Sequence, residues 1–205
     1  WIGRPSDHVF NSISVSDTID IFSLKLNFNQ VNREQVIYVG RLVKDKNVAH
    51  IIEALSKVKN APQLVIVGNG AEKKNLENLA LSLDVNCNFL GNVSEEEKFS
   101  QILKSKFMIF PSCFEGFGIP PSEALALKRP CLASDLDIFI ENYGSNLEYF
   151  KLNDIDDLRI KIEFLLANDK YCLDRGLQGH KFISDSPIWS GSVHKLEKAL
   201  IDGIN

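Results

Sequence analysis

The sequence lacks several features that would place it in a class at once. No stretch approaches the roughly 20 apolar residues that a helix needs to span a bilayer. Basic residues are not in excess, because the net charge is −4 over 205 residues, whereas nucleic-acid-binding domains usually carry a surplus of positive charge. The composition therefore predicts neither a membrane span nor a nucleic-acid-binding protein.

Cysteine is scarce, and its spacing shows no pattern. The four cysteines form no Cys-x-x-Cys pair and have no histidine at the spacing of a zinc site, so no metal centre is predicted. Unpaired thiols are typical of the reducing cytosol, and we expect a cytoplasmic protein. No signal peptide is visible, and because the chain begins with Trp1 rather than Met we expect the native protein to extend further at this end.

What the sequence does contain is the pattern of an α/β domain. Hydrophobic residues make up 44% and charged residues 24%, as in ordinary globular proteins. Apolar runs predict strands at 36–42, 63–67, 85–90, 107–111, 130–134 and 147–150, and amphipathic spacing predicts helices at 46–59, 76–83, 95–106 and 122–127 and through most of 154–202. Continuous apolar strands joined by helices predict a parallel sheet covered on both faces, which is a doubly wound, Rossmann-like fold.

Three regions follow from this pattern. Residues 1–35 are polar and irregular and are expected to form an N-terminal extension. Residues 36–185 would form the Rossmann-like domain. Residues 186–205 would form a final helix after a break at Ser186 and Pro187.

The chemistry should lie at one edge of the sheet, because ligands of open α/β sheets bind beyond the carboxyl ends of the strands. The residues that follow the predicted strands there are Gly40, Arg41, Lys46, Gly68, Gly70, Gly91, Asn92, Glu115, Gly116, Phe117, Gly118 and Ser134. Glycines allow a ligand to approach the backbone, and a helix that begins just after Gly118 would favour an anion. Lys46 is expected in the first turn of its helix, where a cation opposes the helix dipole. Each residue alone is readily explained as a turn or solvated residue, but their convergence predicts a phosphate-bearing ligand, most simply a nucleotide.

The segment 111–124 carries the most specific pattern. It reads PSCFEGFGIPPSEA, in which Glu115 and Glu123 are separated by seven residues. This segment resembles the signature of retaining glycosyltransferases of the two-domain GT-B fold, in the group 1 or family 4 type. Further blocks resemble the same family: YVGRL at 38–42 with Lys46, LVIVGNG at 64–70, FLGNV at 89–93, PCLAS at 130–134, VFNSI at 9–13 as an interdomain hinge, and Trp189 with the segment after it as the helix that crosses back to the other domain.

The resemblance implies a role for each of these positions. Arg41 and Lys46 would hold the diphosphate of a nucleotide-sugar donor, Glu123 would bind the ribose hydroxyls, and Glu115 would face the donor sugar. Gly116, Phe117 and Gly118 would contact the sugar or phosphate, and Gly68 and Val93 would line the donor site. The resemblance implies a UDP- or GDP-linked donor, transfer with retention of configuration, no metal or other cofactor, and a role in cell-surface polysaccharide or lipid-linked glycan assembly.

The resemblance also implies an absent half. The chain would be the donor-binding half of a GT-B enzyme, and an N-terminal domain would bind the acceptor. Any peripheral association with the inner face of the membrane would be made by that N-terminal domain. We therefore expect the isolated chain to bind donor weakly and to transfer nothing. Three departures from the family pattern are Asn47 and Ser12, where glycine is usual, and the segment 135–141, which does not match the usual turn near the donor.

Other functions remain as alternatives. The chain could be a nucleotide-sugar-binding module without catalysis, although Arg41, Lys46, Glu115 and Glu123 are all retained. A sugar-nucleotide epimerase of similar architecture is a second rival. Two carboxylates also suit a glycosidase, but a hydrolase needs no diphosphate clamp. The Asp-x-Asp patterns at 135–137 and 154–156 are too short to assign a metal site.

Overall fold

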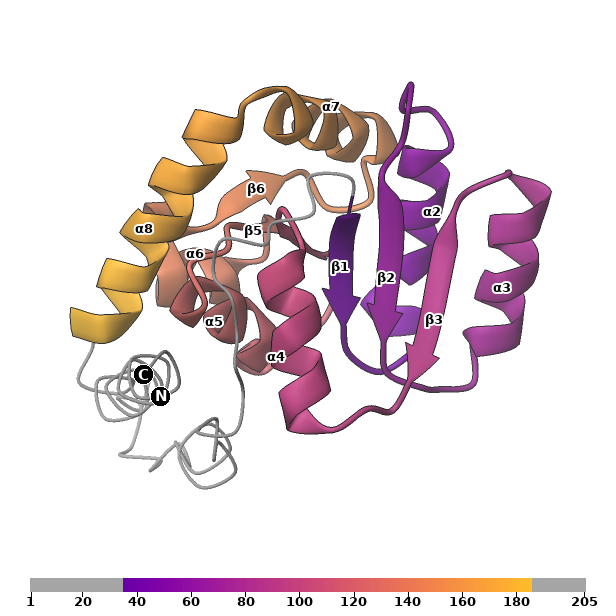
Figure 1. Ribbon diagram of the computed structural model, residues 1–205, viewed down its shortest axis with the longest axis horizontal. Coiled ribbons are helices and arrows are strands. Elements are labelled where there is room, and N and C mark those ends of the chain that lie inside the picture. The colour runs from indigo at the N-terminus through magenta and orange to yellow at the C-terminus, as the bar shows by residue number, and fades with distance from the viewer. Residues whose placement is uncertain (1–34, 186–205) are drawn as a thin grey trace, which may run out of the picture.

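A computed structural model of the chain describes residues 35–185. These residues form a parallel, six-stranded sheet with the order β3-β2-β1-β4-β5-β6 (Figure 1). The strands are β1 (Gln35–Val39), β2 (Gln63–Val67), β3 (Cys87–Gly91), β4 (Met108–Phe110), β5 (Cys131–Ser134) and β6 (Glu148–Phe150). The predicted doubly wound, Rossmann-like α/β fold is confirmed. The predicted extension and the predicted crossover helix lie outside the described residues.

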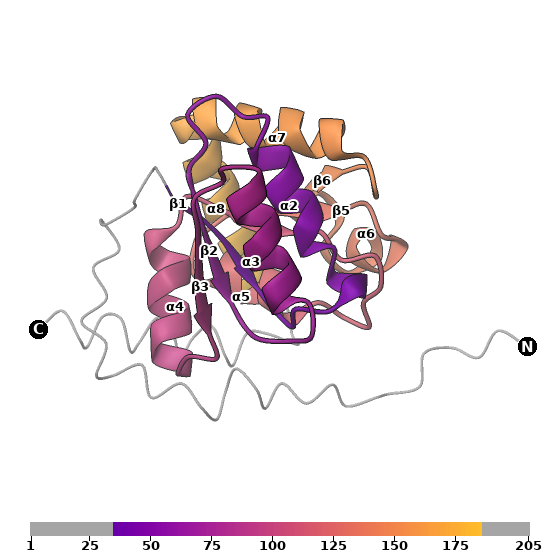
Figure 2. The same ribbon diagram turned by 90° about the vertical axis from the view of Figure 1, so that its right-hand side faces the viewer.

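Helices cover both faces of the sheet. They are α2 (Val48–Leu55), α3 (Lys73–Ser82), α4 (Glu95–Lys104), α5 (Ile119–Ala126), α6 (Asp137–Tyr143), α7 (Ile155–Ala167) and α8 (Asp169–Asp185), with short 3-10 turns at Lys44–Lys46 and Gly144–Asn146. Seen along the sheet, α2 and α3 lie on one side of β1 to β3 and α4 lies on the other (Figure 2). Helix α7 packs against α2, and α8 packs against α5, so the sheet has two helical layers.

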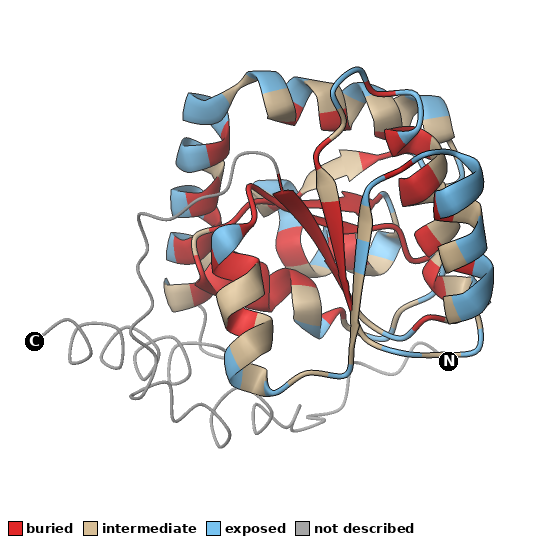
Figure 3. Cartoon of the chain, turned by 45° about the vertical axis from the view of Figure 1, so that its right-hand side comes forward, coloured by how far each residue is buried: buried red, intermediate tan, exposed pale blue. Residues whose placement is uncertain are grey.

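The core lies in the sheet because its strands are almost continuously apolar. All five residues of β1 and all three of β4 are buried, whereas the helices alternate buried inner faces with exposed outer faces (Figure 3). The first strand pairs with β2 on one side and with β4 on the other. Strands that are buried on both faces need no polar alternation, which explains why apolar runs predicted them well.

Two local predictions were wrong. The predicted helix 46–59 is divided: a 3-10 turn ends at Lys46, Asn47 adopts a left-handed conformation with φ 49°, and α2 begins only at Val48. Lys46 is therefore not in the first turn of the helix, and the dipole argument does not apply to it. Asparagine tolerates this conformation almost as glycine does, so Asn47 is a mild replacement for glycine. Helix α6 was not predicted, because its seven residues are too few to show helical spacing clearly.

Candidate functional site

The site lies where the chain changes direction in the sheet. From β1 the chain proceeds to β2 and β3 on one side, and β4 to β6 continue on the other side. At such a switch point the loops that follow the two central strands diverge and leave a crevice at the carboxyl ends of the strands. The arrowheads of β1 to β3 mark these ends, at the bottom of the sheet in Figure 1. A cavity of about 370 Å³ lies at this edge. Its walls are Val39, Gly40, Arg41, Val67, Gly68, Asn69, Asn92, Val93, Glu95 and Lys98.

The structure places five of the sequence-predicted residues in this cavity wall: Gly40, Arg41, Gly68, Asn92 and Val93. Arg41 is exposed in the loop after β1, and Val93 precedes α4. Gly68 has a φ of +130°, and a Cβ atom there would overlap the carbonyl oxygen of Gly40. The loops after β1 and β2 are thus in backbone contact, and the Gly40 amide donates to the Val67 carbonyl at 3.0 Å. Gly68 is required first for this packing, and the packing in turn shapes the cavity.

Lys46 and Glu115 form a close ion pair. The Lys46 Nζ atom donates to Glu115 Oε1 at 2.6 Å and to the Phe114 carbonyl oxygen at 2.9 Å. The lysine side chain is only 8% exposed and that of Glu115 15%. The Ser112 hydroxyl donates to the same carboxylate oxygen at 3.1 Å. The carboxylate partner, rather than an anionic ligand at a helix end, therefore explains why a lysine is buried here.

Tyr38 connects this ion pair to the cavity. Its hydroxyl donates to the Arg41 carbonyl oxygen at 2.9 Å. Burial is the main cause that raises the pKa of Tyr38, and the charges of Glu115 and Asp45 raise it further while Arg41 opposes them. The phenol therefore stays neutral and acts as a fixed hydrogen-bond donor that holds the loop of Arg41 close to the Lys46–Glu115 pair.

The glycine loop before α5 is held by its own packing. Gly118 has a φ of +83°, and an added Cβ would lie 2.6 Å from the Phe139 ring. The Tyr143 hydroxyl donates to the Gly118 carbonyl at 2.7 Å, and the Phe117 and Tyr143 rings lie 6.5 Å apart. Gly116 is exposed, with no atom within 4 Å of an added Cβ. Helix α6, which the sequence did not predict, thus shapes this loop.

The start of α5 is a weaker anion site than the sequence suggested. Prolines occupy positions in its first turn, and proline has no backbone N–H to donate. Two of the donors that a helix N-terminus normally offers are therefore missing. Backbone amides for a bound sugar or phosphate would have to come mainly from residues 116–119, in the loop that precedes the prolines.

Glu123 has a partner that sequence reasoning missed. It is buried within α5, and its Oε1 atom accepts from Lys98 Nζ at 2.8 Å. Lys98 also donates to Glu95 Oε2 at 2.6 Å. Burial raises the pKa of Glu123 even though Lys98 opposes the shift. Because Lys98 lines the cavity with Arg41, this pair places Glu123 next to the same cavity. A signal did exist in the sequence, since Lys98 stands in the first turn of a helix directly after three glutamates.

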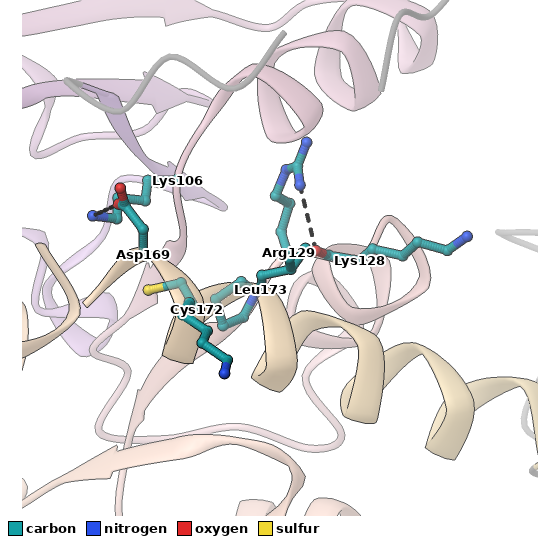
Figure 4. Close-up of a pocket in the computed structure, with 8 residues that line it drawn as sticks. Lys106, Lys128, Arg129, Asp169, Cys172 and Leu173 are labelled. Carbon is teal, nitrogen blue, oxygen red and sulfur yellow. Dashed lines mark hydrogen bonds and ion pairs between the residues drawn. The ribbon is translucent and has the colours of Figure 1, made fainter. Parts of the chain in front are cut away.

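A second cavity, of about 360 Å³, lies at the opposite edge of the sheet (Figure 4). It is lined by Lys106, Lys128, Arg129, Pro130, Asp169, Lys170, Cys172 and Leu173. Lys106 donates to the Leu166 carbonyl at 2.5 Å and pairs with Asp169 at 2.7 Å. Arg129 donates from Nε and from one terminal nitrogen to the Leu103 carbonyl at 2.9 and 2.7 Å. These carbonyls lie in the last turns of α7 and α4, where cations stabilise a helix end.

Neither a metal cluster nor a membrane-spanning helix occurs within residues 35–185. No group of three or more histidine, cysteine or acidic residues in this range could hold a metal ion. No helix in the same range is both long and apolar enough to cross a membrane.

Comparison with known proteins agrees with this geometry. The model of the family described as glycosyl transferases group 1 matches residues 23–182. An uncharacterized glycosyltransferase of Methanocaldococcus jannaschii is 28% identical over 169 residues, which are 76% of this chain and 47% of the relative. The O-antigen chain mannosyltransferase RfbU of Salmonella typhimurium is 28% identical over 159 residues, 71% of this chain and 45% of that protein. The chain thus spans about half the length of these relatives.

Solved structures show the same fold. The S. aureus TarM protein, solved as a mutant in complex with UDP and other ligands, aligns with a TM-score of 0.72 at 21% identity, over 86% of this chain and 38% of TarM. The sucrose-phosphate synthase of Thermosynechococcus elongatus aligns with a TM-score of 0.72 at 20% identity, over 91% and 49% of the two chains. With the family model covering most of the sequence, the chain belongs to the group 1 glycosyl transferases.

Proposed function

We propose that this chain is the donor-binding half of a retaining glycosyltransferase that moves a sugar from a UDP- or GDP-linked donor to a glycan or lipid-linked acceptor. The observation that carries the proposal is the pairing of both signature glutamates with lysines at the switch point, Glu115 with Lys46 and Glu123 with Lys98. The relatives supply the setting: RfbU is named for O-antigen chains and TuaC of Bacillus subtilis for teichuronic acid biosynthesis. These names support the proposed role in cell-surface polysaccharide assembly.

The proposed chemistry is stabilisation of a leaving diphosphate. When the bond between the sugar and the diphosphate breaks, negative charge builds on the phosphate oxygens, and fixed cations lower the energy of that state. In the proposal, Arg41 at the cavity wall and Lys46, the partner of Glu115, supply this charge. In the proposal no metal is needed, because these two side chains do the work that a divalent ion does in other transferases.

Each carboxylate then has a separate task. Glu123, buried beside the cavity, accepts hydrogen bonds from the ribose hydroxyls. Glu115 faces the donor sugar and is held in place by Lys46 and Ser112. The amides of residues 116–118 contact the sugar or the phosphate, while Gly68 and Val93 enclose the nucleotide. The acceptor attacks the face that the diphosphate leaves, the leaving phosphate takes the acceptor proton, and the configuration is retained.

The rest of the enzyme lies outside this chain in the proposal. An N-terminal domain supplies the acceptor site and closes the cleft, and it also carries any peripheral contact with the inner face of the membrane. The isolated chain should therefore bind donor weakly and transfer no sugar. Measurable sugar transfer by the isolated chain would contradict this division of labour.

The test is a calorimetric titration of the chain with UDP, GDP and ADP, each with and without magnesium. We expect one nucleotide to bind equally well in both conditions, and both Arg41→Ala and Glu123→Ala to lose binding by at least about tenfold, as expected for loss of a charged hydrogen bond. Arg159→Ala and Glu163→Ala are matched controls, because these residues pair with each other on α7, and they should bind like the unchanged chain.

The outcomes separate the alternatives. Magnesium-dependent binding would contradict the metal-free clamp, and binding that survives Arg41→Ala and Glu123→Ala would place the nucleotide elsewhere. Donor binding by the full-length protein without transfer to any acceptor would instead support a binding module without catalysis.

A further inference from the structure

Lys98 stands at the centre of a cluster of three charges, of which Glu123 is buried and Glu95 is 42% exposed. It projects from α4, and its Nζ atom lies 2.8 Å from Glu123 Oε1, 2.6 Å from Glu95 Oε2 and 4.6 Å from the centre of the Phe99 ring. Its side chain is 12% exposed and that of Glu123 is 5% exposed. One ammonium group is thus shared by two carboxylates at the wall of the donor cavity.

The position of Lys98 is only partly explained by its own helix, in which it pairs with Glu95 one turn earlier. It lies in the first turn of α4, where the helix dipole favours anions and opposes a cation. The three glutamates that precede it fit that field, and Lys98 does not. Burying a lysine also has a large desolvation cost unless a charged partner compensates for it. Two partners compensate here: Glu95 on the same helix, and Glu123, which comes from another helix, 25 residues further along the chain.

Glu123 needs a counter-charge to do what the proposed function asks of it. An ionised carboxylate is purely an acceptor, whereas a protonated one turns one oxygen into a donor. Burial alone favours the protonated form, and it raises the pKa of Glu123 while the charge of Lys98 lowers it. Burial lowers the pKa of Lys98 itself, but Glu123 and Glu95 outweigh that effect and raise it, so the lysine stays charged.

We propose that Lys98 is a positioning residue of the donor site, whose ammonium group keeps Glu123 ionised and orients its carboxylate so that both ribose hydroxyls can donate to it. The proposal rests on the proposed function of Glu123. In this arrangement Glu95 accepts a second hydrogen bond from the ammonium group and so holds the Lys98 side chain in place at the cavity wall. Removal of Lys98 leaves Glu95 and Glu123 as neighbouring like charges, which raises the pKa of a carboxyl group further.

The other groups packed around Glu123 do not supply this charge. On α6, burial is the main cause that raises the pKa of Tyr143, and Glu123 adds to the shift, so the phenol stays neutral. On α8, His180 places Nδ1 2.8 Å from the Ala126 carbonyl, at the far end of α5. On β5, burial raises the pKa of the Cys131 thiol, which therefore stays uncharged. Lys98 is the cation that acts on Glu123 among the described residues.

The first test reads the charge of Glu123 without any nucleotide. Carbon-13 NMR of the labelled glutamate carboxyl groups in the 205-residue chain follows Glu123 through a pH titration, with the resonance assigned by its loss in Glu123→Gln. We expect Lys98→Met to raise the pKa of Glu123 by at least about one unit, which corresponds to a tenfold change in its ionisation. Lys98→Gln, which keeps a donor but no charge, should raise it as well, and Lys98→Arg should leave it nearly unchanged.

The second test reads the consequence for binding. At neutral pH Lys98→Met should bind the preferred nucleotide at least about tenfold more weakly, and the loss should shrink as the pH rises and Glu123 ionises again. Lys104→Met is the matched control, because Lys104 is exposed in the last turn of the same helix, and it should change neither the pKa of Glu123 nor the affinity.

Two results would overturn the proposal. A pKa of Glu123 that does not move in Lys98→Met and Lys98→Gln would show that Lys98 does not set its charge. A loss of affinity that is the same at every pH would show that Lys98 contacts the nucleotide directly instead. If the unchanged chain binds no nucleotide, the proposed function fails, while the NMR titration still decides whether Lys98 controls the ionisation of Glu123.

Discussion

The two edges of the sheet both bury cations, but they give them different partners. At the amino edge, Lys106 and Arg129 donate to backbone carbonyls in the last turns of α7 and α4, and the carboxylate that pairs with Lys106 there, Asp169, is 45% exposed. At the carboxyl edge, Lys46 and Lys98 donate to the side chains of Glu115 and Glu123. A helix end keeps its cation because its carbonyls have no other donor. A carboxylate beside an open cavity can share its cation with a ligand, which makes the carboxyl edge suitable for binding.

This difference predicts where each substitution acts. Changes at the amino edge should reduce stability and leave nucleotide binding alone. Changes to the charge pairs at the carboxyl edge should reduce binding more than stability. Gly68 is an exception at the carboxyl edge, because its substitution should act mainly on stability.

Gly68→Ala should have the largest effect, and on stability rather than binding alone. A Cβ atom at Gly68 would overlap the Gly40 backbone, at a φ of +130° that side chains rarely adopt. We expect a loss of about 4 kcal/mol or more in the free energy of unfolding, because backbone strain and overpacking are among the few causes of losses of this size. Denaturant unfolding measures it. Gly116→Ala, with open space around the added atom, should change the free energy by less than about 1 kcal/mol.

Arg129→Met should be the next largest. It leaves the buried Leu103 carbonyl without its two guanidinium donors, and an unsatisfied buried acceptor costs about 1–3 kcal/mol. Thermal unfolding should shift accordingly, while the nucleotide affinity of the folded protein stays unchanged. A loss of affinity with unchanged stability would contradict the structural role given to the amino edge.

Lys46→Met should lower stability less and binding more. It leaves Glu115 without its ion-pair partner, but this carboxylate is 15% exposed, so we expect a cost of about 1–2 kcal/mol. Affinity for a nucleoside diphosphate should fall about tenfold or more, because a charged hydrogen bond is worth about 1.5 kcal/mol or more. Lys44→Met, an exposed lysine in the same 3-10 turn, is the control and should change neither quantity measurably.

Glu123→Gln should have the smallest effect on stability, and it should depend on pH. Burial raises the pKa of Glu123 in the folded protein above its unfolded value, so between these two values the folded state holds more protons than the unfolded state. Stability contributed by this group is therefore present at low pH and is lost as the pH rises through the folded pKa. Glu123→Gln removes this loss, so its free energy of unfolding should rise relative to that of the unchanged chain as the pH increases above the unfolded-state pKa. An unchanged slope of stability against pH would contradict the raised pKa.

The fold could be predicted well from sequence because strands that are buried on both faces consist almost entirely of apolar residues. The run at 63–67 is apolar after its first residue, and the predicted and observed bounds of β2 coincide. The left-handed Asn47 could be anticipated from the side chain alone. The pairing of Lys46 with Glu115 could not, since the two residues lie 69 positions apart in sequence.

The site could be predicted only in part. Residues 115–118 were found because they follow a strand in sequence, whereas Glu123 and Val93 were assigned through the family resemblance. The structure gathers Arg41, Gly68 and Val93 around one cavity. Lys98 was missed because its place after three glutamates marks it as unusual but does not identify its partner on another helix. Helix α6 was missed as well, although its Phe139 and Tyr143 hold the loop at Gly118. Pairings made across the fold are the part that a single sequence does not reveal.

The most direct test of the contrast between the two edges is a nitrogen-15 NMR titration of the chain with the nucleotide that binds it. We predict that the backbone amides of residues 40–46, 68–70, 91–98 and 112–118 shift on binding, and that those around Lys106, Arg129 and Asp169 do not. Shifts confined to the amino edge of the sheet would place the ligand in the other cavity and would contradict the assignment of Arg41, Lys46, Glu115 and Glu123 to the donor site.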